Sequence, residues 1–234
     1  MNSYQNLVED LKTDFKINSY SKEYLSRKRK IISLDDIDIK IFGTTAPKIK
    51  ELAKKYISLN LNSFKLDEFF EINLLYFYIG LKKNKDYLEQ INFLLNNKEH
   101  LLSWAITDTT YQYIKFPSFE SCLNVVDNLI NNDNYLIRRY GYLFLFKYID
   151  SMYIDSIFKR IKNDDEYFIV MVEAWLLSSI YVKYPDETFN FLSSNYEIDT
   201  RIKLKTISKD CDSFRIAEDE KVKIKVLRKS LKNK

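Results

Sequence analysis

A helical phrase that returns along the chain is the feature that most restricts its fold. Residues 96–104, 131–139 and 163–169 each begin with an Asn- or Asp-rich turn and continue into an aromatic-rich segment, at intervals of about 31 to 35 residues. Asn and Asp side chains compete for backbone hydrogen bonds, so they favour turns and helix N-caps. A unit this short cannot bury its own apolar face and has to stack on a copy of itself. The repeat therefore predicts an all-α solenoid, a fold that binds large, extended partners along a concave face.

The rest of the chain fits a nearly all-helical fold with short connections. It holds only three glycines and three prolines in 234 residues, and both residue types disfavour helix interiors. From Leu66 onward the apolar spacing predicts consecutive helices, over residues 66–82, 84–96, 98–114, 117–131, 134–149, 151–162, 165–183, 185–194, 199–209 and 218–231. Because no linker or change of composition interrupts it, we expect one domain over residues 1–234, with the helices of residues 1–60 as its N-terminal cap.

The N-terminal 60 residues show a weaker pattern. Residues 2–16 have the spacing of an amphipathic helix, and residues 31–42 mix β-branched residues with acids, which indicates irregular structure or a short helix. Between them lies a basic stretch in which Ser21 is a possible helix cap. Gly43 and Pro47 then open a clear helix, since glycine accepts a positive φ and proline suits a first helical turn.

Several kinds of chemistry are disfavoured by what the chain lacks. His100 is its single histidine, and Cys122 and Cys211 are its two cysteines, so a Cys/His zinc site is not expected and a catalytic Cys-His or Ser-His pair would depend on that one histidine. No glycine cluster forms a phosphate-binding loop. Nucleotide-dependent chemistry of the usual kinds is therefore disfavoured as well. The absence of an apolar run near ~20 residues and of a signal core predicts a cytoplasmic protein without membrane contact.

Charge is distributed unevenly along the chain. Residues 201–234 carry 12 Lys/Arg against 5 Asp/Glu, a balance of +7, while the remainder carries 25 against 28, a balance of −3. A basic C-terminal segment beside a mildly acidic body indicates contact with a polyanion. The alternative is a solvated, lysine-rich terminal helix.

Five side chains inside the repeats are candidates for a site. Trp104 and Asp108 are four residues apart, so on a helix they share one face; the alternative is a core tryptophan beside a solvated or capping acid. Trp175 has apolar neighbours, and its alternative is likewise a core position. Arg138 and Arg139 suit phosphate contacts, but adjacent helical residues point about 100° apart, so at most one faces a given groove. For these two the alternative is a solvated or ion-paired arginine.

Taken together, these positions resemble a known family. Their order is Phe42-Gly43-x-x-x-Pro47, Trp104-x-x-x-Asp108, Asp133-Asn134-x-x-x-x-Arg139 and Phe168-Ile169-x-x-x-x-x-Trp175. This order and spacing resemble the DNA alkylation repair proteins of the AlkD type, over roughly residues 1–230. The resemblance implies a solenoid of HEAT-like repeats with a concave DNA-binding face.

The same resemblance implies a monofunctional DNA glycosylase that acts on N3- and N7-alkylated purines in double-stranded DNA, without metal or cofactor. We expect a monomer, because a one-domain protein that binds a DNA groove is usually monomeric. Such bases are already cationic, so their departure needs little acid catalysis. By this analogy Asp108 stabilises the positive charge that develops on the deoxyribose and positions the attacking water. Trp104 and Trp175 pack against the sugar-phosphate backbone at the lesion, and Arg139 holds a nearby phosphate, with Arg138 as a second candidate for that contact.

The sequence departs from the family pattern mainly in its N-terminal part. Residues 20–41 carry an acidic insert, and either Tyr20 or Tyr24 stands in for the aromatic residue of the family's second helix. Ala105 occupies a position where many members have an acid. These departures keep a second hypothesis open, a non-catalytic DNA-binding paralogue that lacks the N-terminal lesion-contacting element. A third is a helical-repeat scaffold with an apolar concave face for a protein partner.

Overall fold

The computed structural model describes residues 3–194 and 197–232, and in this part of the chain the fold is all-α. Its regular elements are thirteen α-helices and four short 3-10 helices. The only extended pairing found there is an isolated bridge between Lys40 and Phe69. The prediction of an all-α protein built of helical repeats is confirmed.

The chain forms two compact units, the N-terminal unit up to Phe116 and the C-terminal unit from Pro117 onward. The helices of the N-terminal unit are α1 Tyr4–Asn18, α2 Lys22–Ile31, α3 Ala46–Lys55, α4 Phe70–Lys83, α5 Tyr87–Asn96 and α6 Trp104–Thr110. Those of the C-terminal unit are α7 Phe119–Leu129, α8 Tyr135–Leu145, α9 Ile154–Phe158, α10 Tyr167–Tyr181, α11 Pro185–Ser194, α12 Thr200–Asp212 and α13 Glu218–Lys232.

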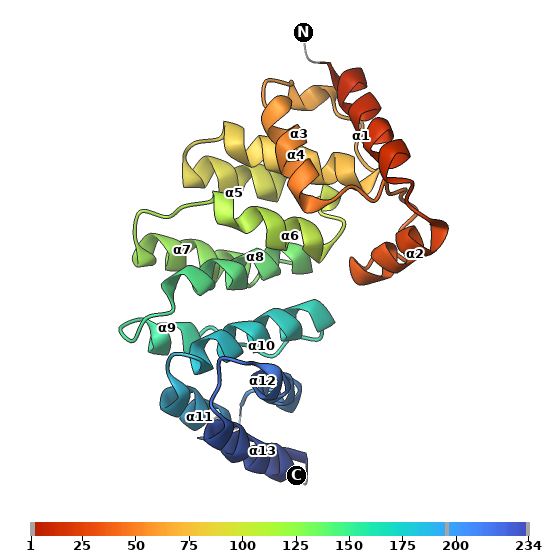
Figure 1. Cartoon of the computed structure of the whole chain (residues 1–234). Coiled ribbons are helices and arrows are strands. Elements are labelled where there is room, and N and C mark those ends of the chain that lie inside the picture. Colours follow the sequence, from red (N-terminus) through yellow and green to blue (C-terminus); the bar gives the residue numbers. More distant parts are fainter. Residues whose placement is uncertain (1–2, 195–196, 233–234) are drawn as a thin grey trace. The chain divides into compact units, whose positions relative to one another are not determined.

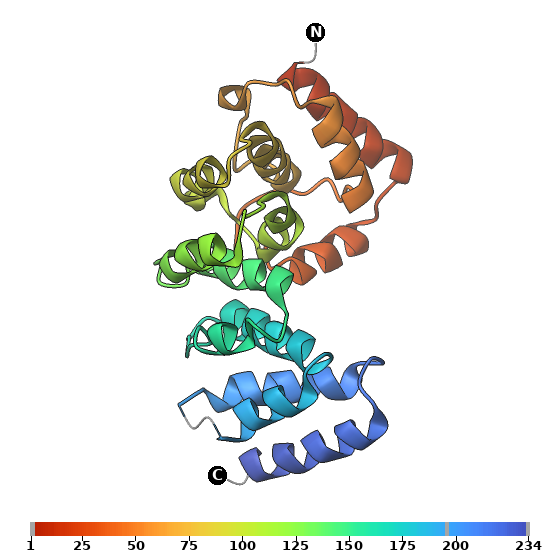
Figure 2. The same cartoon turned by 90° about the vertical axis from the view of Figure 1, so that its left-hand side faces the viewer.

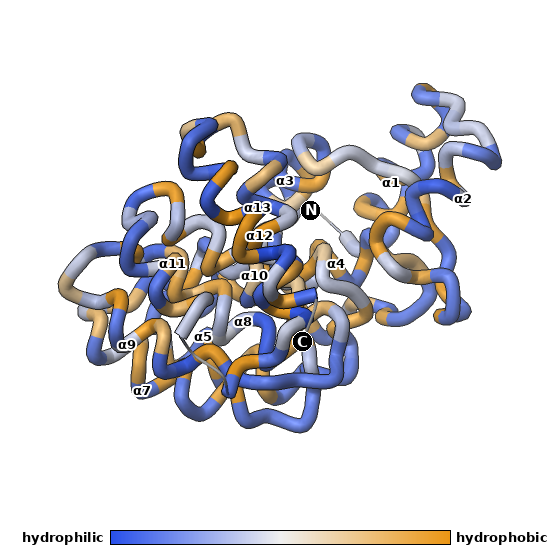
Figure 3. Tube along the Cα trace, turned by 90° about the horizontal axis from the view of Figure 1, so that it is seen from below, coloured by the Kyte–Doolittle hydropathy of each residue, from blue (hydrophilic) through white to orange (hydrophobic). Residues whose placement is uncertain are grey.

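Helix α4 is the core of the N-terminal unit. Every residue from Phe70 to Leu81 is buried, as expected for a helix that is apolar around its whole circumference. Helices α3, α5 and α6 pack against it (Figure 1). Helix α2 contrasts with it, because none of its residues is buried and most of its trace is hydrophilic (Figure 3).

The predicted helix over residues 98–114 is wrong in its extent. A 3-10 turn, Lys98–His100, comes first, and the α-helix begins only at Trp104. Ser103 explains the break: its buried hydroxyl accepts from the Ala105 amide at 3.1 Å and donates to the Ile32 carbonyl at 2.5 Å. An N-cap residue has non-helical backbone angles, so the helix starts after it.

Helix α10 has the corresponding place in the C-terminal unit. It lies between α8 and α12, as both views show (Figure 1 and Figure 2), and ten of its residues are buried. Helix α7 packs on α8, α11 on α10, and α13 on α12. The turn before α8 starts its helix as predicted, because Asn134 is the N-cap residue and its Oδ1 accepts from the Leu136 amide at 2.9 Å. The turn before α10 differs: Asp164 Oδ1 accepts from the Glu166 amide at 2.9 Å, but the N-cap residue Glu166 makes no side-chain cap bond.

Candidate functional site

Helix α6 presents Trp104 and Asp108 together on its outer side. The helix turns Ile106 and Thr110 inward, four residues apart, and leaves Trp104 and Asp108 half-buried one turn apart. The fully buried Thr107 fixes the carboxylate, because its Oγ1 lies 3.0 Å from Asp108 Oδ1 and 2.8 Å from the Trp104 carbonyl oxygen. The predicted sharing of a face by these two residues is therefore seen, and neither is a core residue.

The Phe42-Gly43 element is held by a buried carboxylate that the sequence analysis missed. Gly43 has a φ of 83°, a conformation that favours glycine. Glu71 of α4 accepts from the Phe42 amide at 3.0 Å and the Gly43 amide at 2.8 Å. Burial raises the pKa of Glu71, while these amides and the nearby Lys28 oppose that rise. Lys28 in turn donates to the Thr44 carbonyl at 2.7 Å. The one feature of the sequence that could have indicated this buried carboxylate is the position of Glu71 within an apolar run.

Both candidate tyrosines of the N-terminal part lie against this element. The Tyr20 and Tyr24 rings stack with centroids 4.8 Å apart. A Cβ added to Gly43 would lie 3.1 Å from Tyr20 Cδ2 and 3.2 Å from Tyr24 Cε1. Tyr24 also donates its hydroxyl to the Gly43 carbonyl at 3.4 Å and is 40% exposed. An aromatic pair thus flanks the Phe42-Gly43 element despite the acidic insert.

In the C-terminal unit, Arg139 and Trp175 belong to one row of contacts that α10 makes with α8 and with the 3-10 helix Phe146–Tyr148 that follows it. Arg139 donates through Nη1 to the Phe168 carbonyl at 2.6 Å, and the Phe146 ring packs on Trp175 with centroids 4.6 Å apart. Both contacts join residues 29 apart (168 − 139 and 175 − 146), so the two segments run parallel and in register. Trp175 is 37% exposed on a helix that is otherwise mostly buried, which rules out the alternative of a core tryptophan.

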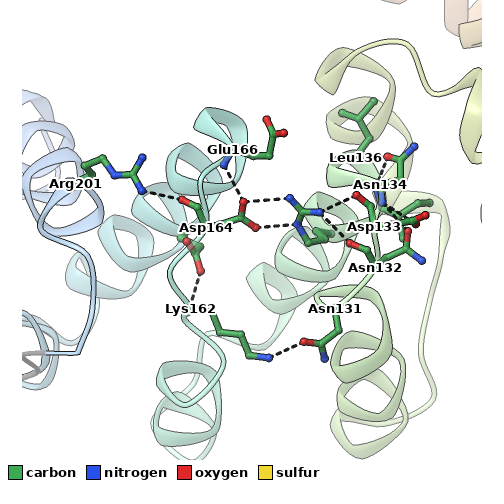
Figure 4. Close-up of polar contacts among 12 residues, drawn as sticks. Asn131, Asn132, Asp133, Asn134, Leu136, Lys162, Asp164, Glu166 and Arg201 are labelled. Atoms are coloured by element: carbon green, nitrogen blue, oxygen red, sulfur yellow. Dashed lines mark hydrogen bonds and ion pairs between the residues drawn. The ribbon is translucent and has the colours of Figure 1, made fainter.

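Arg138 connects two of the repeated Asn/Asp turns. Its Nε and Nη2 donate to the two oxygens of Asp164 at 2.8 and 3.1 Å, and its Nη1 donates to the Asn132 and Asp133 carbonyls at 2.9 and 3.0 Å. Asp164 lies between these turn residues and Arg201 (Figure 4). The ion-paired alternative therefore describes Arg138, and its contact with DNA remains a prediction.

Replacing Arg138 by alanine should lower the free energy of unfolding by about 2–4 kcal/mol, because it strands Asp164 in a site where both side chains are only 16% exposed. The matched control is Arg160→Ala, since Arg160 also pairs through two bonds but with an Asp127 that is 52% exposed. That change should cost at most about 1 kcal/mol. Urea denaturation followed by circular dichroism measures both, and equal losses would contradict the structural role of Arg138.

Two lysines of α12 lie near Arg139, which is itself buried, with only 5% of its surface exposed. Burial lowers the pKa of Lys209, and the charges of Arg139 and Lys205 lower it further, so these three cations are close neighbours within the C-terminal unit. Both lysines belong to the basic segment of the sequence, but neither stands out within it, because regularly spaced lysines near a terminus are also typical of a solvated surface.

The predicted site residues come from both units. Trp104 and Asp108 lie in the N-terminal unit, and Arg139 and Trp175 lie in the C-terminal unit. Each pair is placed within its own unit, and the convergence of all four on one groove remains a prediction.

Three further features concern metal binding, the buried cysteine and membrane-spanning helices. Residues 3–194 and 197–232 contain no group of three His, Cys, Asp or Glu arranged to hold a metal ion. Burial raises the pKa of Cys122 to about 12, so that thiol is protonated and a poor nucleophile. Within the same residues, no helix has the length and apolar character needed to span a bilayer.

Comparison with known proteins gives one family match. A family model described as DNA alkylation repair enzyme matches residues 17–209, a span that includes the Phe42-Gly43 element, α6 and the row of contacts between α8 and α10. No curated protein sequence shows significant similarity to the chain.

Proposed function

This chain belongs to the DNA alkylation repair enzyme family, and on that premise we propose that it is a monofunctional DNA glycosylase. Its substrates would be N3- and N7-alkylated purines in duplex DNA, and it would hydrolyse their N-glycosidic bond. Family membership indicates DNA as the partner. The specific reaction is our proposal, and it rests on the geometry of the side chains in the two units.

The half-buried pair of Trp104 and Asp108, which share one face of α6, is the observation that carries the proposal. Loss of a cationic base leaves positive charge on the deoxyribose, and a fixed carboxylate next to the sugar stabilises that charge. Thr107 holds one Asp108 oxygen at 3.0 Å, so the carboxylate is oriented before substrate arrives. Trp104, one helical turn away, offers a flat apolar surface to the sugar. No metal, cofactor or histidine is required.

Residues of the C-terminal unit would hold the DNA backbone. Trp175 exposes part of its indole beside Phe146, and Arg139 lies near two cations of α12. We assign Trp175 to packing against the sugar-phosphate backbone and Arg139 to a phosphate, with Lys205 and Lys209 adding sequence-independent affinity that falls with salt. We further propose that the protein acts as a monomer in the cytoplasm.

Release of 7-methylguanine from methylated duplex DNA tests the proposal. We expect release well above the spontaneous rate in protein-free DNA, and no release of normal bases from unmethylated duplex. The logarithm of the association constant for duplex DNA should fall linearly with the logarithm of the salt concentration.

Two other outcomes are informative. Duplex binding without release would overturn the glycosylase, favour the non-catalytic paralogue and direct attention to residues 20–41. No duplex binding even at low salt would exclude both functions and favour the protein-binding scaffold.

A further inference from the structure

A cavity of about 340 Å³ lies within the C-terminal unit, between α12, α13 and the start of α10. This volume is at the small end of the range for small-molecule sites, roughly 300–1,000 Å³. The cavity touches neither the Trp104–Asp108 pair nor Trp175. The glycosylase function proposed above therefore does not account for it.

Basic side chains dominate the polar part of the cavity. Arg201, Lys205, Arg228 and Lys232 line it, against one acid, Asp165. Arg201 is already engaged, since its Nη2 lies 2.6 Å from Asp199 and 3.6 Å from Asp165. The other three cations give the cavity a net positive charge and make it suited to an anion.

Arg228 gives the most specific indication of a ligand. Its Nε is buried and has no hydrogen-bond partner among the described residues. A buried donor without a partner costs about 1–3 kcal/mol, more for a charged group, so such atoms call for an explanation. Guanidinium groups bind phosphate oxygens through paired N–H bonds, and a phosphate in the cavity would satisfy this donor.

Apolar and aromatic side chains also line the cavity. Val170 and Leu204 line it together with Tyr167, whose side chain is 54% exposed. The Lys205 ammonium lies over the Tyr167 ring, 5.6 Å from its centroid. A cationic side facing an exposed aromatic ring matches a nucleotide, whose phosphate is anionic and whose base stacks on aromatic surfaces.

A row of cations also extends from the cavity along α12 toward the buried Arg139. Lys205 and Lys209 are one turn apart on α12, and Arg139 and Lys205 both act on the charge of Lys209. This row of cations leads from the cavity to Arg139 within the same unit. A free nucleotide would need no such row, whereas a DNA strand held at Arg139 would follow it.

We infer that this cavity binds the 5′-phosphorylated end nucleotide of a DNA strand. Its phosphate would lie on Arg228, Lys205 and Lys232, and its base on Tyr167. This inference rests on the proposed role of the protein in binding duplex DNA.

An end nucleotide fits this cavity better than an internal one. A terminal phosphate carries a charge near −2 at pH 7, as other phosphate monoesters do, whereas a backbone phosphodiester carries one charge. Three cations match the larger charge. An internal nucleotide would also have to leave the stack, at a cost of a few kcal/mol, whereas a chain end has a neighbour on one side only.

Competition binding with short duplexes that differ only in a 5′-phosphate or 5′-hydroxyl tests the inference. We expect the full-length protein to prefer the phosphorylated duplex about tenfold. Arg228→Gln should remove that preference, and Lys232→Gln, a change at an exposed position, should reduce it. The matched control is Lys229→Gln, which removes the same charge from α13 outside the cavity. It should weaken the binding of both duplexes equally and leave the ratio of their affinities unchanged.

The outcomes separate this inference from the proposed function. Equal affinity of the parent for both duplexes, with 7-methylguanine release intact, would overturn the end site alone. Deoxyadenosine monophosphate that binds as tightly as the phosphorylated duplex would also overturn it, in favour of a free-nucleotide site. A tenfold preference without base release would support the end site and overturn the glycosylase.

Discussion

Replacing Asp108 by asparagine should slow 7-methylguanine release by about 100-fold or more, while affinity for duplex DNA stays unchanged or rises. The loss follows from removing the charge that stabilises the sugar as the base departs, an effect of the size seen when a preorganised electrostatic contact is deleted. Affinity is retained because a carboxylate near phosphates opposes DNA binding. Asparagine keeps an oxygen within reach of Thr107, which lies 3.0 Å from the carboxylate, so the local structure should persist.

Glu89→Gln is the matched control for this prediction. It removes the same charge from an exposed position on α5 of the same unit. Single-turnover assays on methylated duplex should show parent-like rates for this control and the large loss for Asp108→Asn. Parent-like rates for both variants would contradict the role that we assign to Asp108.

The helical content of the protein could be predicted from its sequence because it depends on local patterns. Apolar spacing and Asn/Asp turns indicate where helices form, and Asn134 caps α8 as expected. Helix limits depend on single contacts between distant segments. The hydrogen bond from Ser103 to Ile32, 71 positions away, helps to hold Ser103 in its extended conformation, so the helix predicted over residues 98–114 begins only at Trp104. No local pattern reveals that distant contact.

The candidate site was predictable where exposure follows from helical spacing, and not where it depends on a neighbouring helix. Trp104 and Asp108 share a face because they are four residues apart. Trp175 has apolar neighbours that indicate a core position, yet it packs on Phe146 of the neighbouring segment and stays 37% exposed. Glu71 was missed for the opposite reason, since its partners are backbone amides 28 and 29 positions away.

The protein should become less stable as pH rises from about 5 to 8, because two carboxyl groups are buried in the C-terminal unit. Burial raises the pKa of Asp210 from 3.8 to about 7, against the effect of the Ser178 hydroxyl, and the pKa of Glu173 from 4.5 to about 8. Both side chains are 0% exposed. Between its unfolded and folded pKa values, from 3.8 to about 7 for Asp210 and from 4.5 to about 8 for Glu173, each carboxyl group keeps its proton in the folded state and releases it in the unfolded chain. The free energy of unfolding therefore falls as the pH rises through these ranges.

Asp210→Asn should therefore raise stability at pH 8 and leave it nearly unchanged near pH 4. A pKa of about 7 against 3.8 corresponds to a difference on the order of 4 kcal/mol once the pH exceeds both values. Asparagine occupies the same volume without a charge, so the variant should escape that loss. Urea denaturation at pH 4, 5.5, 7 and 8 measures the effect, and Asp212→Asn, an exposed position on the same helix, is the control. Since Glu173 still titrates in the variant, a smaller decline should remain. If the parent and Asp210→Asn lose stability in parallel from pH 4 to 8, the buried Asp210 carboxyl does not cause the loss of stability.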